Sequence, residues 1–191
     1  MREAAERKRR RAAVKRQLTI GGAVLALAAV VAGLVWFSGA RARRLDAKLT
    51  GGSCDVDTRT DPIQGVGHVD DPTYAVNPPS GGNHLSSAAA AGVYPAGQVP
   101  EGRVVHSMEH GYVVLWHTPE LPAAERDRLA QVQRDHARDV LMVERPGMPV
   151  PVAATAWGHR LLCQTVEADA LDAFIDAYVN EGPEKIEHPP V

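Results

Sequence analysis

Four of the eight histidines lie in or beside a stretch rich in glycine and proline: His68, His84, His106 and His110. His106 and His110 are four positions apart, so a helix places both imidazoles on one face. An extended chain also points both to one side, and it adds the thioether of Met108. Imidazole suits copper and zinc, so the pattern is compatible with a transition-metal site. It is not the zinc-metalloprotease motif, because Glu109 precedes the second histidine instead of following the first.

Two clusters of turn-forming residues accompany these histidines, at residues 77–83 and 92–97. A long irregular stretch inside a compact domain is uncommon, and it is often functional or held in place by a ligand. Loops of this kind can bring side chains together without a regular element. The chemistry of the cluster therefore depends on how the rest of the chain holds these loops.

Regular structure is predicted mainly after residue 104. Continuous apolar, β-branched runs predict buried strands, and helices are predicted from Pro122 to Arg138 and from Asp169 onward, where apolar residues recur at helical spacing. The predicted strands are residues 112–117, 140–143, 152–157 and 160–164. This element order predicts an α+β or α/β domain, in which helices pack on a small mixed sheet with long irregular loops.

The N-terminal part of the chain has the pattern of a membrane anchor. No charged residue lies between Arg16 and Arg41, and an uncharged apolar run of about 20 residues is long enough to cross a bilayer as a helix. The basic residues before it place the N-terminus in the cytoplasm and the remainder outside the cell membrane, as a single-pass protein. A cleaved signal peptide is the alternative, although its apolar run is usually only about 7–15 residues.

Charge divides the chain in the same way. Residues 1–50 carry a net charge of +9, and residues 51–191 carry −11. An acidic body argues against nucleic acid as a partner, because phosphate binding requires clustered basic residues. The predicted organisation is a basic cytoplasmic tail at 1–17, a transmembrane helix at 18–40, a linker at 41–67 and an extracytoplasmic α/β domain at 68–191.

Cys54 and Cys163 are the two cysteines, and both follow the predicted span. On the oxidising side of a membrane they are expected to form a disulfide that closes a long loop. Two unpaired thiols are the alternative. Their separation excludes a CxxC redox pair, and a buried strand position does not favour a thiolate nucleophile at Cys163.

Five motifs occur in an order that resembles the bacterial domain-of-unknown-function family 3105. They are Asn-Pro-Pro-Ser-Gly-Gly-Asn-His ending at His84, Gly-Val-Tyr at 92–94, Val-His-Ser-Met-Glu-His-Gly at 105–111, Thr-Ala-Trp-Gly at 155–158 and Gly-Pro-Glu at 182–184. The resemblance covers roughly residues 54–187 and implies an anchored extracytoplasmic protein of the kind common in actinobacteria. The family pattern often has Pro at position 83 and Leu at position 108. It implies no established activity, and it adds His68 as a fourth candidate ligand.

Three functions of different class follow from these residues. The first is a metal-binding domain that holds copper or zinc through His68, His84, His106 and His110. The second is a metal-dependent enzyme in which Glu109 acts as acid or base. The third is a structural or interaction module of the cell envelope, in which the histidines make structural hydrogen bonds. The remaining histidines are interpreted as structural: His117, His136, His159 and His188.

Overall fold

The computed structural model describes residues 29–30, 33, 52–57, 63 and 65–184. Two compact units divide the chain, Met1–Arg44 and Leu45–Val191, and the sheet belongs to the second. The predicted tail at 1–17 lies outside the described residues, as does the predicted membrane helix at 18–40 apart from residues 29, 30 and 33. Among the residues that are described, no helix is both long enough and apolar enough to cross a bilayer.

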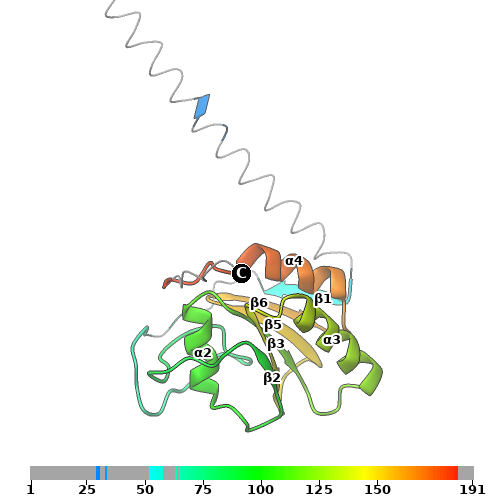
Figure 1. The fold of residues 1–191 in the computed structure, drawn as a ribbon, viewed down its shortest axis with the longest axis horizontal. Helices are drawn as coiled ribbons and strands as arrows, with labels where there is room; N and C mark the ends of the chain where they lie inside the picture. Colours follow the sequence, from blue (N-terminus) through cyan, green and yellow to red (C-terminus); the bar gives the residue numbers. More distant parts are fainter. Residues whose placement is uncertain (1–28, 31–32, 34–51, 58–62, 64, 185–191) are drawn as a thin grey trace, which may run out of the picture. The chain divides into compact units, whose positions relative to one another are not determined.

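A six-stranded mixed sheet forms the centre of the second unit (Figure 1). Its strands are β1 (Cys54–Asp57), β2 (Gly92–Tyr94), β3 (Val113–His117), β4 (Val140–Glu144), β5 (Val152–Ala156) and β6 (His159–Cys163). They lie side by side in the order β1-β6-β5-β3-β4-β2. Strand β4 is parallel to both β3 and β2, whereas the pairs β3–β5, β5–β6 and β1–β6 are antiparallel.

Helices cover both faces of this sheet, as Figure 1 shows. They are α2 (Glu101–Glu109), α3 (Ala123–Asp135) and α4 (Ala168–Tyr178). Successive strand residues point to opposite faces. Leu115 of β3 therefore packs in the core formed with α3 and α4, and its neighbour Trp116 packs in the core formed with α2. Because both faces are covered, the central strands read as continuous apolar runs rather than as alternating ones.

The sequence predicts an α+β or α/β domain, and the structure is α+β, a mixed sheet with packed helices that includes the four predicted strands and the two predicted helices. The strand β1 lies within residues 41–67, for which a linker was predicted, and it pairs along its length with β6. Part of that segment therefore belongs to the sheet. The three-residue strand β2 is not predicted by the sequence, because it lies within the cluster of turn formers at 92–97 and begins at Gly92.

The predicted disulfide is present, and it joins the ends of the two strands at one edge of the sheet. Cys54 of β1 lies opposite Cys163 of β6 in the antiparallel register, and the two sulfur atoms are bonded. Both residues are buried in the core on the α3 and α4 side. The bond therefore fixes the first strand of the domain to the last.

Candidate metal centre

The helix α2 carries two of the candidate histidines toward the loop that precedes it. It begins after Pro100 and buries its apolar side chains against the sheet. His106 and His110 are one helical turn apart and lie on a different side of α2 from these apolar residues. His110 is the C-cap residue of the helix. The segment that the sequence left open between helix and extended chain is thus helical. The apolar side chains that α2 buries against the sheet are those of Val104, Val105 and Met108.

The loop before α2 supplies the other two histidines, and main-chain hydrogen bonds place them next to each other. His68 and His84 form an isolated parallel bridge. The amide of Val69 donates to the carbonyl of His84 across 2.9 Å, and the amide of His84 donates to the carbonyl of Gly67 across 3.1 Å. The side chain of Asn83 accepts a further hydrogen bond from the amide of Gly67. Two histidines far apart in the sequence are therefore fixed as neighbours.

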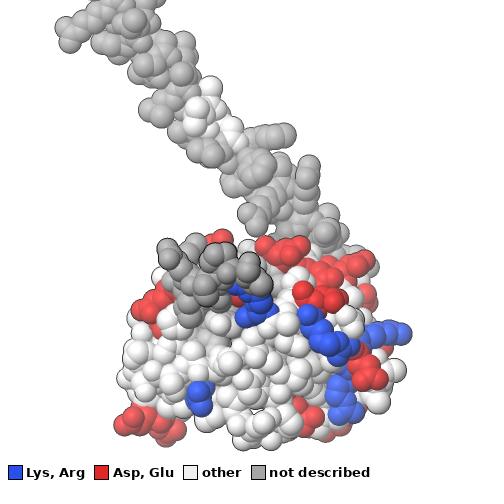
Figure 2. All heavy atoms as spheres, viewed as in Figure 1, with Lys and Arg blue, Asp and Glu red and all other residues white. Residues whose placement is uncertain are grey.

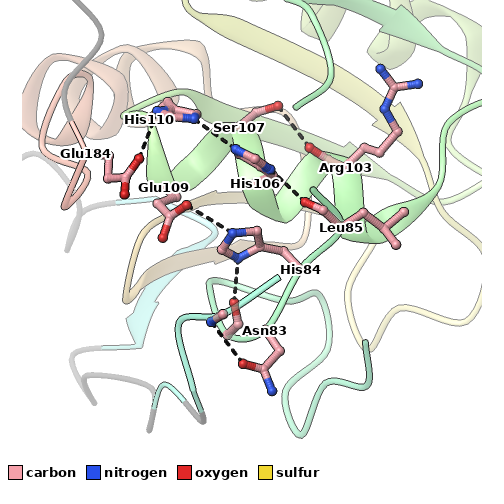
Figure 3. Close-up of polar contacts among 11 residues, drawn as sticks. Asn83, His84, Leu85, Arg103, His106, Ser107, Glu109, His110 and Glu184 are labelled. Atoms are coloured by element: carbon pink, nitrogen blue, oxygen red, sulfur yellow. Dashed lines mark hydrogen bonds and ion pairs between the residues drawn. The ribbon is translucent and has the colours of Figure 1, made fainter. Parts of the chain in front are cut away.

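Four side chains converge between this loop and α2, and three of them, His84, His106 and Glu109, are drawn in Figure 3. His68, His84, His106 and Glu109 each offer a ligand atom, and these four atoms all lie within 4.8 Å of one another. The imidazole rings of His68, His84 and His106 stand 4.7 to 5.0 Å apart between centroids. His84 is fully buried, His106 and Glu109 are each 6% exposed, and His68 is exposed. The cluster is therefore a buried site that opens to solvent at His68.

Backbone carbonyls select the ring nitrogen that the two buried histidines present to the cluster. Nδ1 of His84 lies 2.9 Å from the carbonyl oxygen of Gly82, and Nδ1 of His106 lies 2.6 Å from that of Leu85. A carbonyl can only accept, so both Nδ1 atoms carry the proton. The Nε2 atoms of the neutral rings are then bare acceptors. Metal-ligating histidines are held by the same outer hydrogen bond from the non-ligating nitrogen.

The contact between His84 and Glu109 requires a cation or a proton. Nε2 of His84 lies 3.0 Å from Oε2 of Glu109, and both side chains are almost fully buried. A neutral imidazole with its proton on Nδ1 and an ionised carboxylate are both acceptors at these atoms. Two acceptors at this distance attract one another only through a proton or a metal ion held between them. The pair is therefore a favourable place for a divalent ion.

His106 is held in the neutral form that a metal ligand needs. Burial lowers its pKa below 6.5, and the neighbouring His84, His110 and His68 lower it further, although the hydrogen bond to Leu85 opposes this. Protonation of His106 would place a charge in a poorly solvated site beside three other imidazoles. Nε2 of His106 therefore carries no proton of its own at neutral pH.

His110 takes a different position from the one expected of a fourth ligand. Its Nε2 lies 2.9 Å from Nε2 of His106, so the two rings contact each other directly. It is absent from the set of four converging side chains, in which Glu109 stands instead. His110 belongs to a second group, with Glu109 and Glu184. It differs from the expectation because the last turn of α2 carries it past the loop, toward the C-terminal segment.

Met108 does not face the cluster. It is fully buried in the core between α2 and the sheet, where the hydroxyl of Thr155 donates to its sulfur across 3.2 Å. The indole of Trp116 donates in turn to the same hydroxyl. The helical conformation thus resolves the alternative that the sequence left open for Met108, which is a core residue.

The other described histidines make separate contacts. Nδ1 of His117 lies 2.9 Å from the carbonyl oxygen of its neighbour Thr118, and Nε2 of His136 lies 3.0 Å from a carboxylate oxygen of Asp172. His159 stacks on a tyrosine ring of α4. His188 lies outside the described residues. His117, His136 and His159 belong to neither of the two groups of converging ligand atoms.

Two carboxylate residues, Glu109 and Glu184, lie at the site, and the sequence alone indicates the position of each only weakly. Glu109 was expected to lie near the histidines, and its place among the four converging ligand atoms follows from the helical register of α2. Glu184 was signalled only by the Gly-Pro-Glu motif at 182–184. Backbone hydrogen bonds from the C-terminal segment bring it to the end of α2, a contact that no local pattern encodes.

Comparison with known proteins gives the family of the chain. No match was found among curated proteins, and none among solved structures. A family model described as a protein of unknown function, DUF3105, matches residues 68–189, which include every member of the cluster. The chain therefore belongs to the DUF3105 family of proteins of unknown function.

Proposed function

We propose that this protein binds one divalent transition-metal ion, zinc or copper, through His68, His84, His106 and Glu109. The observation that carries the proposal is the arrangement of His84 and His106, whose Nδ1 atoms are both tied to backbone carbonyls. Nε2 of His84 is thereby directed at the carboxylate of Glu109, 3.0 Å away, and the ligand atom of His106 lies within 4.8 Å of those of His84, Glu109 and His68. Three imidazoles and one carboxylate are a donor set that suits zinc and copper.

A structural role for these histidines is less consistent with the same contacts. A histidine that only stabilises loops is expected to have both ring nitrogens paired with protein donors or acceptors. Nε2 of His84 is fully buried and has no protein donor among the described residues, although the carboxylate of Glu109 lies 3.0 Å away. The arrangement suits a cation between the two atoms, a proton or a metal ion, better than it suits a network of neutral hydrogen bonds, and the titration below distinguishes the two.

A metal-dependent enzyme is the second candidate, and the donor set argues against it. A catalytic ion usually keeps a position open for water or substrate, whereas four protein ligands close a tetrahedral site. A cavity of about 460 Å³ does lie near the beginning of α2, lined by Trp116, Arg145 and Glu101 among others. No member of the histidine cluster lines it. We therefore favour metal binding over catalysis at this ion.

Metal titration of the purified chain, after treatment with a chelator, tests the proposal. The wild-type protein is expected to bind zinc or copper with at least one tight equivalent in isothermal titration calorimetry. Glu109→Gln keeps the shape of the side chain but removes its charge, and it is expected to weaken that equivalent strongly. Glu120→Gln is a matched control on an exposed loop. A wild-type protein that binds neither metal would leave the histidines with a structural role.

We further propose that the domain is held at the outer face of the cell membrane by the segment 18–40. The uncharged apolar run and the basic residues before it support this placement. On the face drawn in Figure 2, basic side chains form small separate groups among acidic ones, which is unlike a phosphate-binding surface. Cysteine labelling from outside intact cells tests the topology. Glu120→Cys should react and Ala5→Cys should not, and the reverse pattern would refute it.

A further inference from the structure

The carboxylate of Glu109 lies at the junction of two groups of potential ligands. One of its oxygens faces His84 across 3.0 Å. The same side chain also belongs to a second group with His110 and Glu184, in which one atom from each residue lies within 4.8 Å of the others. Figure 3 shows His110 and Glu184 on the far side of Glu109 from His84. A carboxylate with ligands on both sides can bridge two ions.

The hydrogen bond between the two helix histidines determines which nitrogen His110 presents to this second group. Nδ1 of His106 donates to Leu85, so its Nε2 can only accept. Nε2 of His110, 2.9 Å away, must then be the donor. The opposite nitrogen, Nδ1 of His110, is therefore a bare lone pair. It is buried, and it has no hydrogen-bond partner among the described residues.

Glu184 faces this lone pair and is held there by the backbone. Its Oε2 lies 4.0 Å from Nδ1 of His110. Its amide donates to the carbonyl of Glu109 across 3.0 Å, and the amide of Asn180 donates to the carbonyl of Gly111 across 2.8 Å. Gly182, which lies between Asn180 and Glu184 in the sequence, approaches α2 so closely that a Cβ would overlap the carbonyl oxygen of Glu109. The segment is thus fitted to the end of the helix.

We propose that a second divalent transition-metal ion binds between Glu109, His110 and Glu184, with Glu109 as the bridging ligand. This inference rests on the proposed function, because Glu109 bridges two ions only when the first position is occupied. Glu184 is 66% exposed at its side chain, and the side chain of His110 is 19% exposed. The second position is therefore the accessible one, with fewer protein ligands, and it binds more weakly than the first. Paired ions in proteins lie about 3.5–4 Å apart, a separation that one carboxylate can bridge.

Stoichiometry separates this inference from the proposed function. The full chain is titrated with zinc and analysed by calorimetry, and bound zinc is counted after equilibrium dialysis. Two equivalents, one tight and one weak, are the expected result. A single tight equivalent overturns the second position and leaves the first intact, whereas no binding overturns both.

A matched pair of variants assigns the weak equivalent. Glu184→Gln is expected to lose the weak equivalent and to keep the tight one. Glu181→Gln, an exposed position in the same segment, is expected to keep both. Retention of two equivalents by Glu184→Gln would refute the assignment. In a copper titration of the wild-type protein, the second equivalent should broaden the electron paramagnetic resonance signal of the first. An unaltered signal would show that the two ions are not neighbours.

Discussion

The imidazole of His106 donates from Nδ1 to the carbonyl oxygen of Leu85 across 2.6 Å. This bond joins α2 to the loop that carries His84, and it directs Nε2 of His106 toward Nε2 of His110, 2.9 Å away. A single hydrogen bond thus sets both the tautomer and the direction of the ring. Outer hydrogen bonds of this kind orient a ligand before the metal arrives, and they raise its basicity.

Replacing His106 by alanine is therefore expected to remove tight metal binding. Loss of an outer hydrogen-bond partner alone costs about 10–100-fold in affinity. Loss of the ligand itself should weaken zinc or copper binding at least about 100-fold, measured by competition with a chelator. His136→Ala is the control, because that histidine contacts Asp172 away from the cluster and should keep the wild-type affinity. Equal affinities in the two variants would contradict the assignment of His106.

Met108→Leu is expected to leave metal binding unchanged. The thioether packs in the core and accepts a hydrogen bond from Thr155, so it supplies nothing to the cluster. A swap that conserves volume in a core usually costs less than about 1.5 kcal/mol of stability. Parallel metal titration and thermal denaturation of the variant check both statements. A large loss of copper affinity without unfolding would mean that the sulfur reaches the ion.

The parts of the fold that the sequence predicted are those with strong local patterns. The strands β3 and β4 are buried on both faces, so their apolar runs are continuous, and α4 carries a clear stripe that includes Leu171 and Phe174. The strands β1 and β2 have four and three residues and lie at the edges of the sheet, so they have little pattern to detect. Their positions depend on pairing with distant strands.

The site was predictable only in part for a related reason. The spacing of His106 and His110 places them on one side in a helix and in a strand alike, so it could not decide the conformation of α2. The helix then brings Glu109 to the four-ligand group and carries His110 to the next one. The neighbourhood of His68 and His84 comes from a bridge between two loop segments. Long-range main-chain contacts of this kind have no sequence signature.

The stability of the metal-free protein is expected to fall on acidification through His106. Its pKa is 6.5 in the unfolded chain and lower in the folded protein, chiefly because it is buried. Between these two pKa values the unfolded state binds more protons, so the free energy of unfolding decreases as the pH falls below about 6.5. Chemical denaturation with a chelator present, at pH 7.5, 6.5 and 5.5, measures the slope. His106→Gln should show a smaller slope than the wild-type protein, and an equal slope would refute this contribution.

Removal of the disulfide is expected to reduce stability and to spare the metal site. Cys54 and Cys163 are separated by 109 residues, so the bond restricts a long loop of the unfolded chain, and losing such a bond typically costs about 2–5 kcal/mol. Both cysteines pack in the core with α3 and α4, whereas the proposed metal ligands lie with α2 on the other face of the sheet. The double variant Cys54→Ala/Cys163→Ala should therefore unfold at lower denaturant and still bind zinc with wild-type affinity while folded. An unchanged denaturation midpoint would contradict the stabilising role, and two free thiols in the denatured, non-reduced wild-type protein would contradict the bond itself.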